Sequence, residues 1–250
     1  MSEITVVTSF SYEGYQLYGR RFLETFLQFW PKNIRFLLYH EGGFDFGLDL
    51  LKESPACADF LSRHENDLVS KGRMVNMPGK WKVRDIEKGY NFRYDAFKFA
   101  RKVFAIEAAA KRLKQGLLFW LDADIFTHKP LSFTFLESLL PSSIDVCFLG
   151  RELKHSECGF VGYALDHVEV KNMIHYFAGL YATDQVFTLQ EWHDSYVFDI
   201  CRLQFHLRGN NLSRLDRGNV FDTSCLGEYM RHLKGNRKLK GKGLLELHAI

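Results

Sequence analysis

The chain has 250 residues, of which 46% are apolar and 25% charged, a composition typical of a folded globular domain. No apolar run approaches the roughly 18 residues of a membrane span, and the opening Met-Ser-Glu does not resemble a signal peptide, so we expect a cytoplasmic protein. The net charge of +3 is uneven: residues 231–242 hold six Lys and Arg and no acids, which leaves 27 basic against 30 acidic residues elsewhere, and this acidic remainder disfavours a broad nucleic-acid-binding groove.

Strands and helices alternate in the first part of the chain. Ile4–Ser9 has the pattern of a short buried strand, and an amphipathic helix is predicted over Tyr15–Phe29. Ile34–His40 is predicted as a second strand. Residues 41–92 give no clear pattern apart from a helical piece near residues 56–68.

The alternation continues to about residue 180. We predict helices and strands over Arg93–Lys114 (with Gly116 just past the helix end), Leu117–Leu121, Asp145–Gly150, Gly159–Leu165 and Val168–Leu180. Such alternation indicates one α/β domain over residues 1–250, with a mostly parallel central sheet flanked by helices. In sheets of this kind, ligands bind at the carboxyl ends of the strands.

The five cysteines are scattered along the chain and form no C-x-x-C pair. They are Cys57, Cys147, Cys158, Cys201 and Cys225. An odd number with this spacing predicts reduced thiols, and argues against both a disulfide framework and a zinc knuckle.

Two aspartates follow the apolar strand in "GLLFWLDADIF". Asp122 and Asp124 flank one small residue at the carboxyl end of the predicted strand, so their side chains can point at a common spot. Two unpaired carboxylates near a dry sheet edge repel each other, by roughly 4 kcal/mol at 4 Å and an effective dielectric constant of about 20. A divalent cation such as Mg²⁺ or Mn²⁺ removes that cost. The alternative is a solvated turn, because a bare D-x-D occurs by chance in many proteins.

The basic end of the chain contains a second pattern, "HLKGNRK". Its imidazole, His232, can be a third metal ligand, while Gly235 lets the backbone approach an anion and Lys238 offers a charge to a phosphate oxygen. The alternative is a solvated basic segment. Together with the aspartates, this pattern makes a clamp for a diphosphate, in which a metal stabilises the charge of the leaving group.

The stretch "FWLDADIFTHKPL" resembles the D-x-D region of metal-dependent glycosyltransferases of the GT-A fold, a Rossmann-like fold. "HLKGNRK" is similar to the H-x-x-G-x-x-K motif of the retaining family that includes glycogenin and the lipopolysaccharide galactosyl- and glucosyltransferases. One departure is Leu239-Lys240, where that family usually has Pro-Trp. The resemblance implies a Mn²⁺ or Mg²⁺ ion on Asp122, Asp124 and His232. It also implies a nucleotide-diphosphate sugar, expected to be a UDP-sugar, with its diphosphate on Asp122, Gly235 and Lys238 and the basic segment 231–250 closing over it.

The same resemblance suggests further site residues. Candidates for contacts with the nucleotide or sugar are Thr8, Ser9, Tyr15, Lys98 and Arg101. On the side of the transferred sugar, "SECGFVGY" offers Glu157 and Gly159, and "LQEWHDSYVFD", whose spacing is helical, offers Asp194. Asp194 and Glu157 are the candidate catalytic residues, Asp194 through sugar hydroxyls or an oxocarbenium-like centre. Each of these residues has an ordinary alternative as a turn, helix or loop side chain.

The sequence leaves other functions open. Haloacid-dehalogenase-type phosphohydrolases use D-x-D-x-T after a strand, although here Thr127 lies one position too late. A nucleic-acid-binding protein could use the basic end. For a transferase, the acceptor is a saccharide, a glycolipid, a protein or modified DNA, and transfer with retention of anomeric configuration is expected from the resemblance alone.

Overall fold

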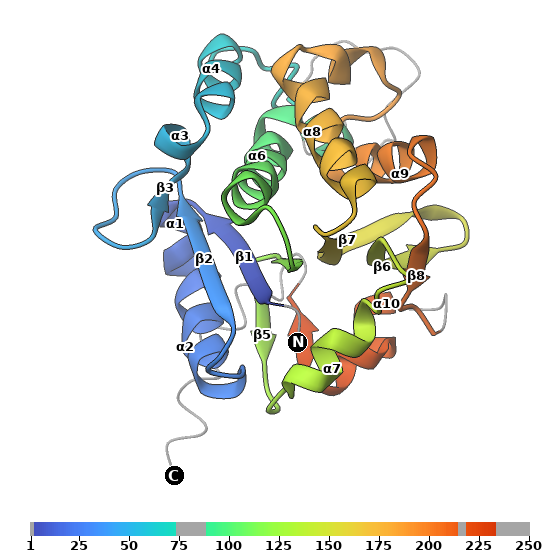
Figure 1. The fold of residues 1–250 in the computed structure, drawn as a ribbon. Coiled ribbons are helices and arrows are strands. Elements are labelled where there is room, and N and C mark those ends of the chain that lie inside the picture. The colour runs from blue at the N-terminus through green and yellow to red at the C-terminus, as the bar shows by residue number, and fades with distance from the viewer. Residues whose placement is uncertain (1–2, 74–88, 215–218, 234–250) are drawn as a thin grey trace.

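The computed structural model describes residues 3–73, 89–214 and 219–233. Seven strands form the central sheet in the order β3-β2-β1-β4-β7-β6-β8 (Figure 1). Their bounds are β1 Ile4–Phe10, β2 Arg35–His40, β3 Leu48–Asp49, β4 Leu117–Leu121, β6 Val146–Arg151, β7 Lys154–Ala164 and β8 Gly209–Asn211. Two further strands, β5 Ile125–Thr127 and β9 Met230–His232, pair with each other outside this sheet.

The central sheet is mostly parallel, as predicted. β1 lies between β2 and β4 and is parallel to both, with Val6 opposite Phe36 and Phe119. β7 is the exception, because it runs antiparallel to β4 on one side and to β6 on the other. The carboxyl ends of β1, β2 and β4 therefore lie at one edge of the sheet, which is where the sequence places the two aspartates.

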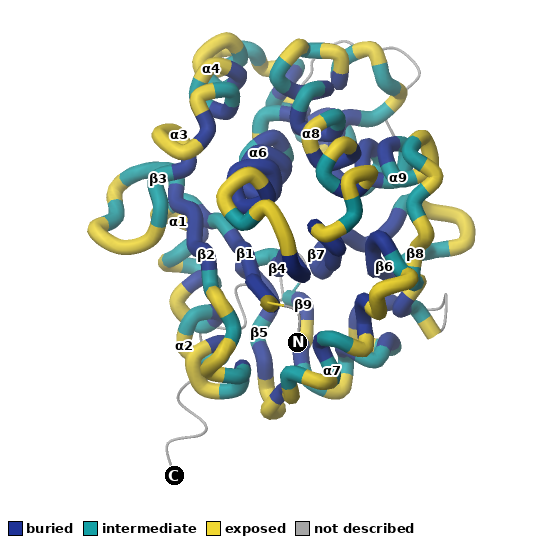
Figure 2. The backbone as a smooth tube through the Cα atoms, viewed as in Figure 1, coloured by how far each residue is buried: buried dark blue, intermediate teal, exposed yellow. Residues whose placement is uncertain are grey.

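Helices cover both faces of the sheet (Figure 1). One face carries α4 Pro55–Arg63, α6 Ala96–Leu113, α8 Val168–Ala182 and α9 Asp194–Gln204. The other carries α2 Arg20–Phe29, α7 Phe133–Leu139 and α10 Val220–Thr223. β4 is buried throughout because its side chains alternate between the two cores: Leu118 and Trp120 pack on the first, and Leu117, Phe119 and Leu121 on the second (Figure 2).

The remaining elements are short. They are α1 Tyr12–Gly14, the π-helix η1 Tyr15–Gly19, α3 Leu50–Glu53, and the 3-10 helices η2 Phe92–Tyr94, η3 Gln185–Thr188 and η4 Cys225–Glu228. Among the described residues, no helix combines the length and apolarity that crossing a membrane requires. All five cysteines are free thiols.

Three sequence expectations are corrected. The helix expected over Tyr15–Phe29 is present, but its first five residues form the π-helix η1 and α2 begins only at Arg20. The residue that leaves α6 in a left-handed conformation is Lys114, with φ of 64°, and not Gly116, which has its own φ of 87° and passes close to the carbonyl of Glu3. The segment 189–199 becomes helical only at Asp194, so its first five residues lie outside α9.

Candidate functional site

The two aspartates stand where β4 ends and the chain turns into β5. The backbone N–H of Asp122 extends the pairing of β4 with β7, because it donates to the carbonyl of Gly159 at 2.9 Å. The side-chain Oδ1 of Asp122 accepts a hydrogen bond from Trp120 Nε1 at 2.7 Å. The side chain of Asp122 is 29% exposed, whereas that of Asp124 is only 8% exposed. A carboxylate as buried as Asp124 needs a positive or hydrogen-bonding partner.

That partner is His232, which is 108 positions further along the chain. β9 pairs with β5 so that His232 lies opposite Ile125, and the N–H of Leu233 donates to the carbonyl of Asp124 at 3.0 Å. His232 Nε2 lies 2.8 Å from Asp124 Oδ1 and 3.7 Å from Asp122 Oδ2. The D-x-D strand end and the H-x-x-G-x-x-K segment therefore meet at one point, through a strand pair that the sequence pattern did not predict.

Glu157 and Gly159 on β7 complete the surroundings of this histidine. Glu157 Oε1 lies 3.1 Å from His232 Nδ1, so both ring nitrogens face carboxylates. A Cβ atom on Gly159 would approach His232 Nδ1 and Cε1 to 2.7 Å, so any side chain larger than that of glycine would clash with the ring in this position. Burial alone would lower the pKa of His232, but the hydrogen bonds to Asp124 and Glu157 and the charges of Asp124 and Asp122 raise that pKa to about 9.

Lys102 is a site residue that sequence reasoning missed. Its Nζ lies 3.0 Å from Asp122 Oδ1 and 2.7 Å from Asp194 Oδ2, and it also donates to the carbonyl of Cys158. Burial would lower the pKa of this ammonium, but the two carboxylates raise it above its ordinary value. The available signal was its place one helical turn beyond Lys98, with the apolar run from Val103 directly after it.

The donor set fits a divalent cation. One ligand atom from each of Asp122, Asp124 and His232 lies within 4.8 Å of the others, and two carboxylates with one imidazole suit Mn²⁺ or Mg²⁺. A metal ion and a proton compete for the imidazole nitrogen, so a cation bound here would displace the proton that the carboxylates now hold on His232.

Two cavities meet at this cluster. The smaller has a volume of about 390 Å³ and lies against the ends of β1 and β2, with Ser9, Phe10, Ser11 and Glu41 in its wall. The larger, of about 720 Å³, lies on the β7 and α9 side. Both are lined by Lys98, Phe99, Asp122, Asp124 and Asp194, so the aspartates stand at the junction. Two compartments joined at a charged cluster can hold two parts of a substrate, or two substrates.

The other predicted residues divide into groups. Ser9, Lys98 and Arg101 line the smaller cavity, and Arg101 Nε forms an ion pair with Glu41 Oε2 at 2.6 Å. Glu157, Gly159 and Asp194 line the larger cavity.

Thr8 and Tyr15 lie outside the walls of both cavities. Thr8 is fully buried, and its hydroxyl donates to the carbonyl of Leu121 at 2.7 Å, which ties β1 to β4. Tyr15 packs edge-on against Phe44. Gly235 and Lys238 lie outside the described residues.

Comparison with known proteins gives a structural match without a sequence match. No protein-family model matches the chain, and no curated protein does. Over 96% of this chain and 99% of its own, the crystal structure of a glycosyltransferase involved in the glycosylation of the major capsid of PBCV-1 superposes with a TM-score of 0.55 at 11% identity. The chain shares the fold of that glycosyltransferase. Mouse xyloside xylosyltransferase 1 also aligns, with a TM-score of 0.47 and 12% identity over 89% of this chain and 93% of that one.

Within this fold, the cluster of Asp122, Asp124 and His232 lies at the carboxyl end of a central strand, with a cavity on either side. That edge of an open α/β sheet is where such folds bind their ligands. The identity of 11% supports the fold alone, and the chemistry of the site depends on its own residues.

Proposed function

We propose that this protein is a metal-dependent glycosyltransferase, of the hexosyl- or pentosyltransferase class, which takes its sugar from a nucleotide-diphosphate donor. The observation that carries the proposal is the meeting of two aspartates and a distant histidine between two cavities. A bound Mn²⁺ or Mg²⁺ would supply positive charge to a diphosphate leaving group as the glycosidic bond breaks.

In this proposal, the smaller cavity receives the nucleotide. Ser9 offers a hydroxyl to a ribose or base, and Lys98 offers a charge to the phosphates. Glu41, which pairs with Arg101 in the same wall, offers a carboxylate that can accept hydrogen bonds from ribose hydroxyls or a base. Gly235 and Lys238, which follow β9 in the sequence, are proposed to hold the diphosphate of a UDP-sugar.

The larger cavity then receives the transferred sugar and the acceptor. Asp194 and Glu157 are carboxylates in its wall, and they are connected to the cluster through Lys102 and His232 respectively. Asp194 can accept hydrogen bonds from sugar hydroxyls or stabilise positive charge at the anomeric carbon. Lys102 acts as a positioning residue, because its ammonium fixes Asp122 on the donor side and Asp194 on the sugar side at the same time.

The position of Thr127 argues against the phosphohydrolase alternative. Its hydroxyl accepts a hydrogen bond from Trp30 Nε1 at 2.9 Å, and the residue is 3% exposed, so it stabilises the packing of α2 on β5. No comparable observation favours nucleic-acid binding, whose basic segment lies almost wholly outside the described residues. Transfer with retention, and an acceptor that is a saccharide, a glycolipid or modified DNA, stay predictions.

The proposal is tested by a thermal-shift panel of nucleoside diphosphates with and without Mn²⁺. We expect UDP to raise the melting temperature only when the ion is present. At a UDP concentration of 100 times its Kd, the free energy of unfolding should rise by about 2.7 kcal/mol. Asp124→Asn should remove this shift and leave the fold intact, whereas Asp59→Asn should keep it, because Asp59 is 65% exposed and pairs with Arg63 on the surface of α4. Metal-independent binding of UDP, or an unchanged shift in Asp124→Asn, would overturn the proposal.

A further inference from the structure

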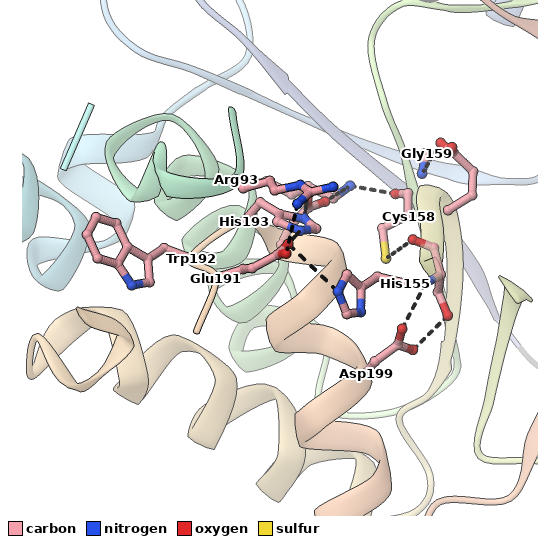
Figure 3. Close-up of polar contacts among 12 residues, drawn as sticks. Arg93, His155, Cys158, Gly159, Glu191, Trp192, His193 and Asp199 are labelled. Atoms are coloured by element: carbon pink, nitrogen blue, oxygen red, sulfur yellow. Dashed lines mark hydrogen bonds and ion pairs between the residues drawn. The ribbon is translucent and has the colours of Figure 1, made fainter. Parts of the chain in front are cut away.

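A second group of metal-binding side chains lies in the wall of the larger cavity, apart from the aspartate pair. His155 comes from the start of β7, and Glu191 and His193 come from the segment just before α9. One ligand atom from each lies within 4.8 Å of the others. Figure 3 shows the two imidazoles and the carboxylate turned toward one another across the gap between the two segments.

The distances suit a small tetrahedral ion. Glu191 Oε2 lies 2.8 Å from His193 Nε2 and 3.7 Å from His155 Nε2. Ligand atoms at about 2.0–2.1 Å from a zinc ion in tetrahedral geometry lie roughly 3.3–3.4 Å apart, and the two measured distances fall on either side of that value. Side-chain rotations that move these ligand atoms by less than about one ångström would therefore bring all three within bonding distance of one ion.

The surroundings hold these ligands in place. Both imidazoles face Oε2 of Glu191, while Arg93 Nη1 lies 3.5 Å from its other oxygen, Oε1, so the arginine orients the carboxylate without occupying its ligand side (Figure 3). The His155 ring packs edge-on against Tyr196, with centroids 4.8 Å apart. The His193 ring is buried against Phe92.

We propose that His155, Glu191 and His193 bind one transition-metal ion, with Zn²⁺ the best match to two imidazoles and one carboxylate. Three protein ligands leave the fourth position of a tetrahedral ion open, and all three proposed ligands line the larger cavity, so a molecule in that cavity could supply the fourth. An oxygen ligand of a molecule in the cavity, such as a hydroxyl or a carboxylate, completes the site. If the cavity receives the acceptor, as proposed above, the ion selects acceptors that carry such a group.

The site is distinguished from the aspartate cluster by its ligand chemistry. Two carboxylates dominate the cluster of Asp122 and Asp124, which suits hard cations, whereas two imidazoles dominate this site and favour Zn²⁺ or Co²⁺. The two are connected through Asp194, whose Oδ1 lies 4.0 Å from His193 Nδ1 and whose Oδ2 is held by Lys102. An ion at His193 therefore lies one residue from the proposed sugar-binding carboxylate.

The test is a Co²⁺ and Zn²⁺ titration of the full chain carrying Asp124→Asn, which weakens the first cluster and leaves the second whole. Visible absorption of four-coordinate Co²⁺ and calorimetry of Zn²⁺ report binding without any need for activity. We expect one ion per chain in this variant, and a loss of affinity of at least about 100-fold when His155→Ala is added, since even the loss of an outer-shell partner costs about 10–100-fold.

His175→Ala is the matched control, because His175 also pairs with a glutamate, Glu107 at 2.9 Å, but lies on the exposed face of α8. It should bind Co²⁺ as the parent variant does. His155 is 38% exposed, so its substitution is compatible with folding, and a far-ultraviolet spectrum checks this. No ion bound to Asp124→Asn, or undiminished binding after His155→Ala, would overturn the proposed site, whether or not the nucleotide test succeeds.

Discussion

Gly159→Ala tests whether His232 depends on a space that only glycine leaves open. The added Cβ would lie 2.7 Å from two atoms of the His232 ring and 3.0 Å from Glu157 Oε1, whereas ordinary contacts begin at 3.4 Å. The ring is buried and paired on both sides, so it has to move by about 0.7 Å, away from the position it holds beside Asp124. Overpacking of this kind costs about 1–3 kcal/mol, which lowers the melting temperature by roughly 2–12 °C in a chain of this size.

Gly179→Ala is the matched control. Gly179 lies inside α8, and a Cβ there meets nothing within 4 Å, so alanine should stabilise the protein by about 0.5–1 kcal/mol through its better helix propensity. Thermal unfolding and Mn²⁺-dependent UDP binding are measured on both variants. The account predicts lower stability and weaker binding for Gly159→Ala, and neither loss for Gly179→Ala. Wild-type melting and wild-type Mn²⁺ affinity in Gly159→Ala would refute the reasoning.

Further substitutions probe the charges around the site and the sheet. Lys102→Met leaves two carboxylates without their shared ammonium and should cost about 3–5 kcal/mol in denaturant unfolding, part of which Mn²⁺ restores; an unchanged midpoint would contradict this. Asp194→Asn should keep UDP binding within about threefold but lower kcat by at least about 100-fold, as measured by transfer or hydrolysis of a UDP-sugar. Hydrogen bonds from Arg208 hold the pKa of Asp145 well below its ordinary value, against the opposing effect of burial. Asp145→Asn should therefore cost about 2–3 kcal/mol above pH 5, and the difference should shrink steadily as the pH falls below about 4; a difference independent of pH would exclude this role.

The alternation of strands and helices was predictable because hydrophobic patterns are local. Leu117–Leu121 is apolar at every position, since two helical layers cover it, and the sequence alone marks it as a central strand. The short strands were not predictable. β5, β8 and β9 have three residues each, and their pairing depends on partners up to about a hundred positions away. β5 and β9 are the elements that bring His232 to Asp124, so the chemistry of the two motifs and their resemblance to a known family anticipated that meeting, whereas periodicity did not.

Polar residues inside the fold were the hardest to assign from sequence. Lysines on amphipathic helices are usually solvated, and α6 offered Lys98 and Arg101 as equally good candidates. α6 is instead packed between the sheet, α4 and α8, so Lys102 is buried and faces Asp122. Thr8 shows the opposite outcome: a residue typical of a nucleotide-binding turn lies one position too early and bonds to a neighbouring strand. Tertiary packing determines which residues of an element face the site, and a single sequence does not reveal that packing.

The central claim is that residues from the middle and the end of the chain hold one divalent cation at the junction of the two cavities. Anomalous diffraction at the manganese absorption edge, from crystals grown with Mn²⁺ and UDP, locates that ion directly. The account predicts a peak within about 2.0–2.4 Å of carboxylate oxygens of Asp122 and Asp124 and of His232 Nε2, with the diphosphate on its open side. A fully occupied peak that none of these three side chains touches, or UDP bound in the cavity without an ion, would contradict it.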